Sequence, residues 1–145
     1  MPAWTAQTVS WEERETPEGT VVSHRPPYYA GPSLGGFFRM RGYPRFRFND
    51  RSAIYYGAEY RYTPQWQPLR EIRFLKFLEI DWWQLVPFFE VGRVAGRWDL
   101  GELHSDMKVD GGIGLRIMAR KTVLRLDVGI SGESWGAWAM VGHPF

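Results

Sequence analysis

The residues of this 145-residue chain that could do chemistry are few, and their spacing predicts no catalytic site. Ser131 lies in the sequence GISGE, which misses the Gly-x-Ser-x-Gly pattern by one position and lacks its strand-turn-helix setting. A glycine-rich stretch at 111–114 falls inside a predicted strand, so it does not predict a phosphate-binding loop. No metal-binding spacing links the three histidines, which are His24, His104 and His143. We therefore expect a non-enzymatic protein without a metal or a cofactor.

Arg41 is the charged residue with the most unusual surroundings. It lies in the segment 34–43, with the sequence LGGFFRMRGY, which contains Gly35, Gly36, Gly42 and Tyr43. The prolines and glycines between Pro26 and Asp50 predict one long loop, and loops of this length in a compact protein are usually functional. We expect this loop to fold onto the strands that follow it, with Arg41 at its tip.

The elements that must receive Arg41 are predicted to be β-strands. Apolar and polar residues alternate with a period of two in the clearest segments, which indicates one apolar and one polar face. About six antiparallel strands are predicted, at Trp4–Trp11, Ile54–Tyr62, Trp83–Val94, Met107–Ile117, Val123–Ile130 and Trp135–Phe145. The sequence therefore predicts an all-β chain with a long loop at 26–50 and strands from 52 to 145.

Three intervening segments are less regular. Glu12–Gly19 is charged and contains Pro17 and Gly19, so it is predicted to be a turn or loop. Thr20–Tyr29 is ambiguous. Pro64–Ile80 is interpreted as a connector, in which apolar residues every three positions fit either a short helix or an extension of the next strand.

The composition narrows the classes of function. A formal net charge of +2, with scattered basic residues, does not favour a nucleic-acid-binding protein. The chain contains no cysteine, so neither a disulfide nor a cysteine-ligated metal is expected. Aromatic residues make up 17% of the chain, and amphipathic rings concentrate where a membrane meets water. No apolar run approaches the roughly 20 residues of a spanning helix, and no secretory signal is visible.

The polar faces of the predicted strands favour a membrane barrel over a soluble sheet. They carry charges of both signs interleaved with Gly57, Gly112, Gly114 and Gly129. Glycines inside a strand weaken it, but they let a loop pack closely against the strand backbone. The best segments are also about nine to eleven residues long, which is the length of a tilted transmembrane strand. We therefore expect the apolar faces to meet lipid and the polar faces to line the interior.

Several motifs, taken in order, resemble the C-terminal barrel portion of the BamA/TamA-type outer-membrane assembly and translocation superfamily, the bacterial surface antigen family. The segments 34–36 and 40–43 are similar to the lumen-loop signature of that family, and 57–61 to the acidic strand segment after it. The segment 89–94 (FEVGRV) resembles the aromatic-acid-x-glycine strand motif of the family, and 112–116 and 124–129 resemble its last strands but one. Phe145 resembles the end of the assembly signal on the final strand. The resemblance covers about residues 28–145.

The resemblance implies a non-enzymatic barrel in the bacterial outer membrane that inserts barrel proteins or moves polypeptides. It implies that Arg41 pairs with acids on adjoining strands, for which Glu90 and Glu59 are the candidates. Where the family usually has an aspartate, this chain has Glu90. The assembly signal would comprise Trp135, Val141 and Phe145.

The resemblance also implies partners: outer-membrane lipid, unfolded barrel-protein substrates, and further strands. Six strands cannot close a lipid-exposed barrel, so the remaining strands or other chains are needed for closure. The implied mechanism is a weak lateral seam beside the last strand, whose edge can template an incoming strand.

Two other hypotheses remain open from the residues alone. One is a soluble β-sandwich or small barrel that binds an apolar ligand, because alternating strands also build such folds. The other is a barrel-anchored hydrolase whose catalytic domain lies outside this chain.

Overall fold

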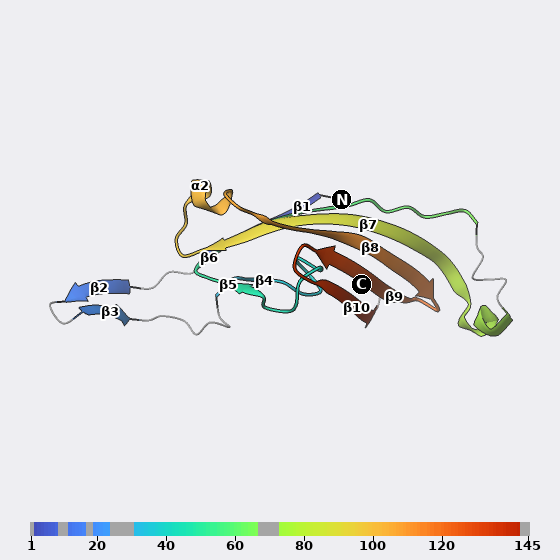
Figure 1. The fold of residues 1–145 in the computed structure, drawn as a ribbon. Coiled ribbons are helices and arrows are strands. Elements are labelled where there is room, and N and C mark those ends of the chain that lie inside the picture. Colours follow the sequence, from blue (N-terminus) through green and yellow to red (C-terminus); the bar gives the residue numbers. More distant parts are fainter. Residues whose placement is uncertain (1, 9–11, 17–18, 24–30, 67–72, 143–145) are drawn as a thin grey trace.

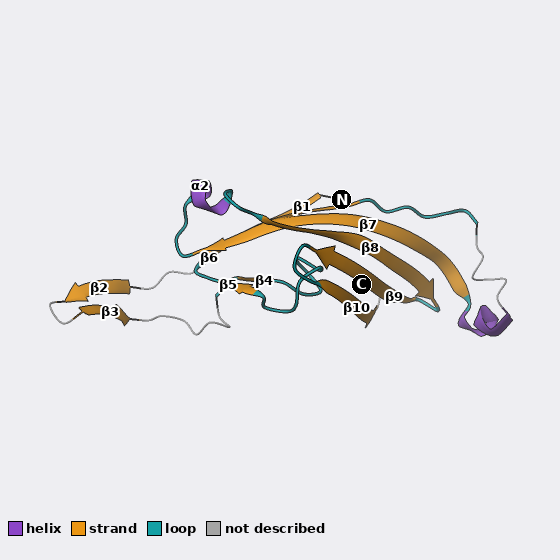
Figure 2. Cartoon of the chain, in the orientation of Figure 1, coloured by secondary structure: helices purple, strands orange, loops and turns teal. Residues whose placement is uncertain are grey.

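The computed structural model describes residues 2–8, 12–16, 19–23, 31–66 and 73–142, and these form an all-β fold (Figure 1, Figure 2). Six antiparallel strands make one sheet in the order β1-β6-β7-β8-β9-β10. Their bounds are Pro2–Thr8, Ser52–Glu59, Ile80–Ala95, Lys108–Ala119, Thr122–Ser131 and Trp135–Gly142. The prediction of an all-β chain built on antiparallel strands is confirmed.

The strand bounds differ from the predicted ones mainly at the ends. Strand β6 stops at Glu59 instead of Tyr62, and Tyr62 forms only an isolated bridge with Leu85. Strand β7 is longer than predicted and contains an irregularity in register between Ile80 and Trp82. Alternation defines the middle of a strand, whereas its ends depend on whether a partner strand continues beside it.

The prediction of a turn or loop at Glu12–Gly19 is wrong. Strand β2 (Glu12–Thr16) pairs with β3 (Gly19–Ser23) in a separate two-stranded sheet, with Arg14 opposite Val21. Gly19 is the first residue of β3, residues 17–18 lie outside the described part, and charged residues do not prevent backbone pairing. The ambiguous segment 20–29 therefore begins as a strand, since β3 extends to Ser23. Residues 24–30 lie outside the described residues.

The predicted connector Pro64–Ile80 contains a 3₁₀-helix, η2 (Arg73–Leu78), and then the start of β7 at Ile80. A recurrence of apolar residues every three positions matches the three residues per turn of this helix type. Residues 67–72 lie outside the described part. No helix among the described residues is both long enough and apolar enough to cross a membrane.

The predicted loop 26–50 is described from residue 31 onwards, and it is not wholly irregular. Strands β4 (Ser33–Leu34) and β5 (Phe48–Asn49) pair with each other and close the base of the loop. Figure 1 shows β4, β5 and the intervening turns beneath the curved sheet, with the short helix α2 (Leu100–Leu103) on the other side. The loop therefore covers one face of the sheet.

The two faces of the sheet differ in polarity, and the apolar face is the exposed one. The covered face carries polar and charged side chains, and the buried ones include Glu90, Asp110, Arg116 and Asp127. The opposite face carries apolar side chains, which are 48–66% exposed at Phe89, Val109, Ile113, Val128 and Ile130. A soluble antiparallel sheet normally has the reverse arrangement, with its apolar face packed on a core.

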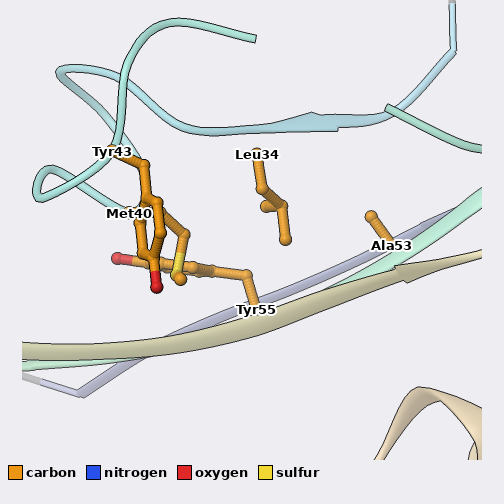
Figure 3. Packing of buried hydrophobic residues seen from close by; sticks show 5 residues of the cluster. All are labelled: Leu34, Met40, Tyr43, Ala53 and Tyr55. Atoms are coloured by element: carbon orange, nitrogen blue, oxygen red, sulfur yellow. The ribbon is translucent and has the colours of Figure 1, made fainter. Parts of the chain in front are cut away.

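Two small apolar clusters lie on opposite faces of the sheet, both against residues 53–55 of β6. Under the loop, Leu34, Met40 and Tyr43 pack against Ala53 and Tyr55 of β6 (Figure 3). On the opposite face, Leu103 of α2 covers Ile54 and Ala95.

Helix α2 is only one turn long, and its N-terminus is capped by Asp99, which accepts hydrogen bonds from the backbone N–H groups of Gly101 and Glu102. Both hydrogen bonds lower the pKa of the Asp99 carboxyl, and the bond from Glu102 has the larger effect. The cap therefore holds α2 and Leu103 in place over one end of the apolar face.

Candidate functional site

The centre of the covered face is the pair Arg41–Glu90. The Arg41 backbone N–H donates to Glu90 Oε2 at 2.7 Å, and Arg41 Nε donates to Glu90 Oε1 at 3.2 Å. Arg41 Nη2 lies 3.1 Å from the same Oε1. Tyr55 adds a hydrogen bond from its hydroxyl to Glu90 Oε1 at 2.6 Å. The Glu90 carboxylate thus fixes the loop by its backbone as well as by its side chain.

Two further carboxylates and one ring complete the surroundings of the Arg41 guanidinium. Its Nη1 lies 3.0 Å from Glu59 Oε1 and 3.0 Å from Asp127 Oδ2. Its Cζ lies 3.4 Å from the centre of the Phe88 ring, a cation–π contact. Arg41 is only 2% exposed, so these partners replace the water that a surface guanidinium would bind.

The backbone on either side of Arg41 is also bound. The carbonyl of Arg41 accepts a hydrogen bond from Trp138 Nε1 of β10 at 2.8 Å. The Gly42 N–H donates to Asp110 Oδ2, and the Gly42 carbonyl accepts from the hydroxyls of Ser131 and Ser134 at 3.1 and 2.8 Å. Strands β7 to β10 therefore all contribute contacts to two consecutive loop residues.

Small residues on the strands allow this close approach. A Cβ atom built on Gly129 would lie 2.7 Å from both the Arg41 carbonyl carbon and the Gly42 nitrogen. A Cβ on Gly136 would overlap the Arg41 carbonyl oxygen in the same way. Of the four strand glycines noted in the sequence, Gly129 faces the loop backbone, whereas the other three lie closest to atoms of the sheet itself.

The loop holds its shape through the predicted glycines. Gly35 and Gly36 have φ values of +109° and +113°, a region that favours glycine. Their N–H groups donate to the carbonyls of Arg39 and Met40 at 3.2 and 3.3 Å, which folds the tip back on itself. The Tyr43 hydroxyl donates to the Val109 carbonyl at 3.2 Å and attaches the far side of the tip to β8.

The charges around Arg41 form a network of both signs. Asp127 is bound by Arg116 and by Arg125, whose Nε lies 2.8 Å from Asp127 Oδ2. Glu59 is bound by Arg61 at 3.1 Å. Burial by itself lowers the pKa of Arg41, but Glu90 and then Asp127 outweigh this effect and raise the pKa above its usual value. Arg41 is therefore a permanent cation in a setting that compensates its charge.

The structure brings the loop residues named from the sequence together with both named acids, since Arg41 contacts Glu90 and Glu59. The three residues named for the assembly signal lie apart from this cluster. Trp135 and Val141 on β10 are 71% and 68% exposed, and Phe145 lies outside the described residues. Gly42 and Tyr43 lie next to Arg41 and also bind the strands. Gly35 and Gly36 make the backbone hydrogen bonds that fold the loop.

Sequence reasoning missed several residues of the cluster, among them Asp127, Asp110 and Trp138. Asp110 and Asp127 were visible as acids on polar strand faces, but only the strand register puts them under the loop. Trp138 lies opposite Asp127 in the β9–β10 pairing, on the covered face. A signal was available, because alternation in β10 puts Gly136, Trp138 and Met140 on one face.

The cluster contains no arrangement for a metal ion, since no group of three or more suitable side chains was found among the described residues. Its carboxylates are engaged by guanidinium and backbone N–H groups, which suits a structural anchor. No protein-family model, no curated protein and no solved structure matches the chain.

Proposed function

We propose that this chain is part of an outer-membrane β-barrel of the BamA/TamA type, which inserts barrel proteins into the outer membrane or moves polypeptides across it. The observation that carries the proposal is the anchored Arg41 loop on the charged face of a sheet whose opposite face is apolar and exposed. The role is structural and templating, without catalysis.

The sidedness of the sheet supports a lipid environment. An apolar face of this extent is rare on a soluble monomer, whereas membrane barrels carry such a face on the outside. A soluble sandwich that binds an apolar ligand needs a second layer over this face. Among the described residues, α2 covers only one end of it, near Ile54 and Ala95.

The edges of the sheet support a need for partners. In the described sheet, β1 and β10 each pair with one strand only. Unpaired backbone groups are costly in hydrocarbon, so further strands, from the same polypeptide or from other chains, are required for closure. The edge of β10 is the part that would template a strand of an unfolded barrel-protein substrate.

The Arg41 loop would brace this edge. Its tip binds β10 through Trp138 and binds β7 through Glu90, so one loop connects the last strand to a strand three positions away in the sheet. Such a brace holds the interior side of β10 in place while its outer backbone edge is free to accept a partner.

Membrane insertion is tested by folding the chain from urea into phospholipid vesicles and floating the vesicles on a density gradient. The chain is expected to float with the vesicles. Val128→Arg, on the apolar face, is expected to abolish flotation, because arginine at the lipid face costs about 2–4 kcal/mol at mid-membrane. Met140→Arg, the same substitution on the other face, is the matched control. A chain that stays monomeric in the aqueous phase would contradict the membrane assignment.

Assembly activity is tested with the same vesicles. A small urea-denatured outer-membrane barrel protein is added, and its folding is followed by the shift of the folded band in unheated gel electrophoresis. Vesicles that carry the chain are expected to raise the folding rate of the added protein relative to empty vesicles. The Arg41→Ala variant is expected to raise this rate by less. If the chain inserts but the folding rate is unchanged, the proposed activity is wrong and the membrane assignment stands.

A further inference from the structure

A pocket lies on the loop that carries Arg41. It has a volume of about 430 Å³, and its lining includes Gly36, Phe37, Phe38, Arg39, Arg45 and Phe46. This volume is within the range of small-molecule sites. None of the contacts that anchor the loop to Glu90 uses the pocket, so it is a separate feature of the same loop.

The pocket has a cationic rim without acidic partners. The loop carries four arginines; Arg41 pairs with Glu90, and Arg47 lies 3.1 Å from Glu133. Among the described residues, Arg39 and Arg45 form no ion pair with a carboxylate. Arg39 donates to the neutral Gln7 side chain at 2.9 Å, and Arg45 lies 5.7 Å from the Trp138 ring centre. Both guanidinium groups therefore have donors left for an anion.

The same pocket presents aromatic surface. Phe38 and Phe46 are 74% and 62% exposed, which is far more than a structural role would require. Phe37 is buried, packs edge-on against Phe38 and lies under the Arg125 guanidinium at 4.3 Å. Behind these rings, Gly36 leaves space for Arg45, since a Cβ there would lie 3.0 Å from Arg45 Cγ. The Phe37 wall is thus held in place by a contact with the sheet.

We propose that this pocket binds acidic side chains that alternate with aromatic ones in an extended polypeptide segment. One carboxylate would bind the planar guanidinium of Arg39, on the side of β1, and a second would bind that of Arg45, on the side of β10. The neighbouring ring would pack on Phe38 and Phe46. The inference rests on the proposed function, because the polypeptide would be the substrate that the barrel handles.

The position of the pocket favours a polypeptide over a lipid. The pocket is formed by the loop that covers the charged face of the sheet, and the apolar face lies on the opposite side. Lipid in a membrane would meet the apolar face, whereas a polypeptide in the interior would meet the loop. The charge of the rim also favours an anionic partner over a purely apolar ligand.

The test is direct binding to the full chain folded in zwitterionic detergent micelles. A short fluorescent peptide with alternating Asp and Phe is titrated, and its anisotropy is measured. Arg39→Gln and Arg45→Gln are each expected to weaken binding about tenfold, the effect of losing one charged hydrogen-bonding partner. Arg47→Gln is the matched control, because it removes the same charge from the same loop outside the pocket, and its affinity is expected to be unchanged.

A second set of measurements separates the pocket from general charge attraction. Phe38→Ala is expected to weaken binding about fivefold without a change in charge. Peptides with Asn in place of Asp, or with Ala in place of Phe, are expected to bind at least about tenfold more weakly. Equal losses for Arg39→Gln and Arg47→Gln would overturn the proposal, as would tighter competition by an anionic phospholipid micelle than by the unlabelled peptide. These measurements involve no barrel insertion, so their failure is distinct from failure of the proposed function.

Discussion

Arg41 is bound to Glu90 twice, once through its backbone N–H at 2.7 Å and again through its guanidinium at 3.1–3.2 Å. A side-chain pair alone would leave the loop free to pivot about the arginine. The backbone bond removes this freedom, because it fixes the position of the Arg41 peptide relative to β7. The pair is therefore an anchor for the chain as well as a charge pair.

Arg41→Ala is expected to destabilise the fold strongly. Removing one partner of a buried ionic network leaves Glu90 and Asp127 without their shared cation, which costs about 3–5 kcal/mol. The free energy of unfolding is measured by urea denaturation in micelles, and limited proteolysis reports cleavage within residues 31–50.

Arg47→Ala is the control for this substitution. Arg47 and Glu133 are both half exposed, and an exposed pair contributes about 0–1 kcal/mol. Unchanged cleavage of the loop in Arg41→Ala would contradict the anchoring role.

Gly129→Ala is expected to displace the loop from β9. The new methyl group would lie 2.7 Å from the Arg41 carbonyl carbon, which is backbone and cannot move aside without the loop. Overpacking of this kind costs about 1–3 kcal/mol. Gly132→Ala is the comparison, since a Cβ there meets no atom within 4 Å. If urea denaturation gives the same free energy for both variants, the loop does not pack on Gly129.

Trp138→Phe is expected to weaken the connection between the loop and β10. Phenylalanine keeps a ring on the covered face but loses the Nε1–H donor to the Arg41 carbonyl, a loss of about 1 kcal/mol. Trp135→Phe removes an indole from the other face of the same strand, where Trp135 is 71% exposed. Hydrogen exchange at residues 40–43 is expected to rise for Trp138→Phe and to stay constant for Trp135→Phe. Equal exchange in the two variants would argue against the hydrogen bond.

Asp110→Asn is expected to raise stability by about 0.5–1 kcal/mol, in contrast to its neighbours in the cluster. Asp110 lies directly opposite Glu90 in the β7–β8 register, so two acids face each other, and no described residue binds Asp110 Oδ1. Asparagine keeps an oxygen that can accept from the Gly42 N–H while it removes the like charge.

Glu90→Gln is the contrasting variant, because it removes the charge that pairs with Arg41. It is expected to lower stability by about 2 kcal/mol. Urea denaturation distinguishes the two substitutions, and a loss of stability in Asp110→Asn would show that its charge is needed.

The period-two alternation of the sequence by itself determined much of this fold. It located the strands and gave each a polar face, while the prolines and glycines at 26–50 indicated a long loop with Arg41 at its tip. These features are local, because side chains alternate across a strand whatever its partners are. The hairpin β2–β3 was not predicted, because its charged segment shows no apolar alternation. Its strands pair through backbone hydrogen bonds, which do not depend on such a pattern.

Only the tertiary structure decided that Asp127 joins Glu90 and Glu59 around Arg41 and that Asp110 binds the neighbouring Gly42. Register sets Asp110 opposite Glu90, and the loop that precedes β6 brings residues 41 and 127 within 3.0 Å although 86 positions separate them. Contacts at this separation depend on how the loop lies on four strands at once, and no local pattern encodes that. Alternation defines two faces, but the packing of Arg41 and Gly42 on Gly129 makes the charged face the covered one.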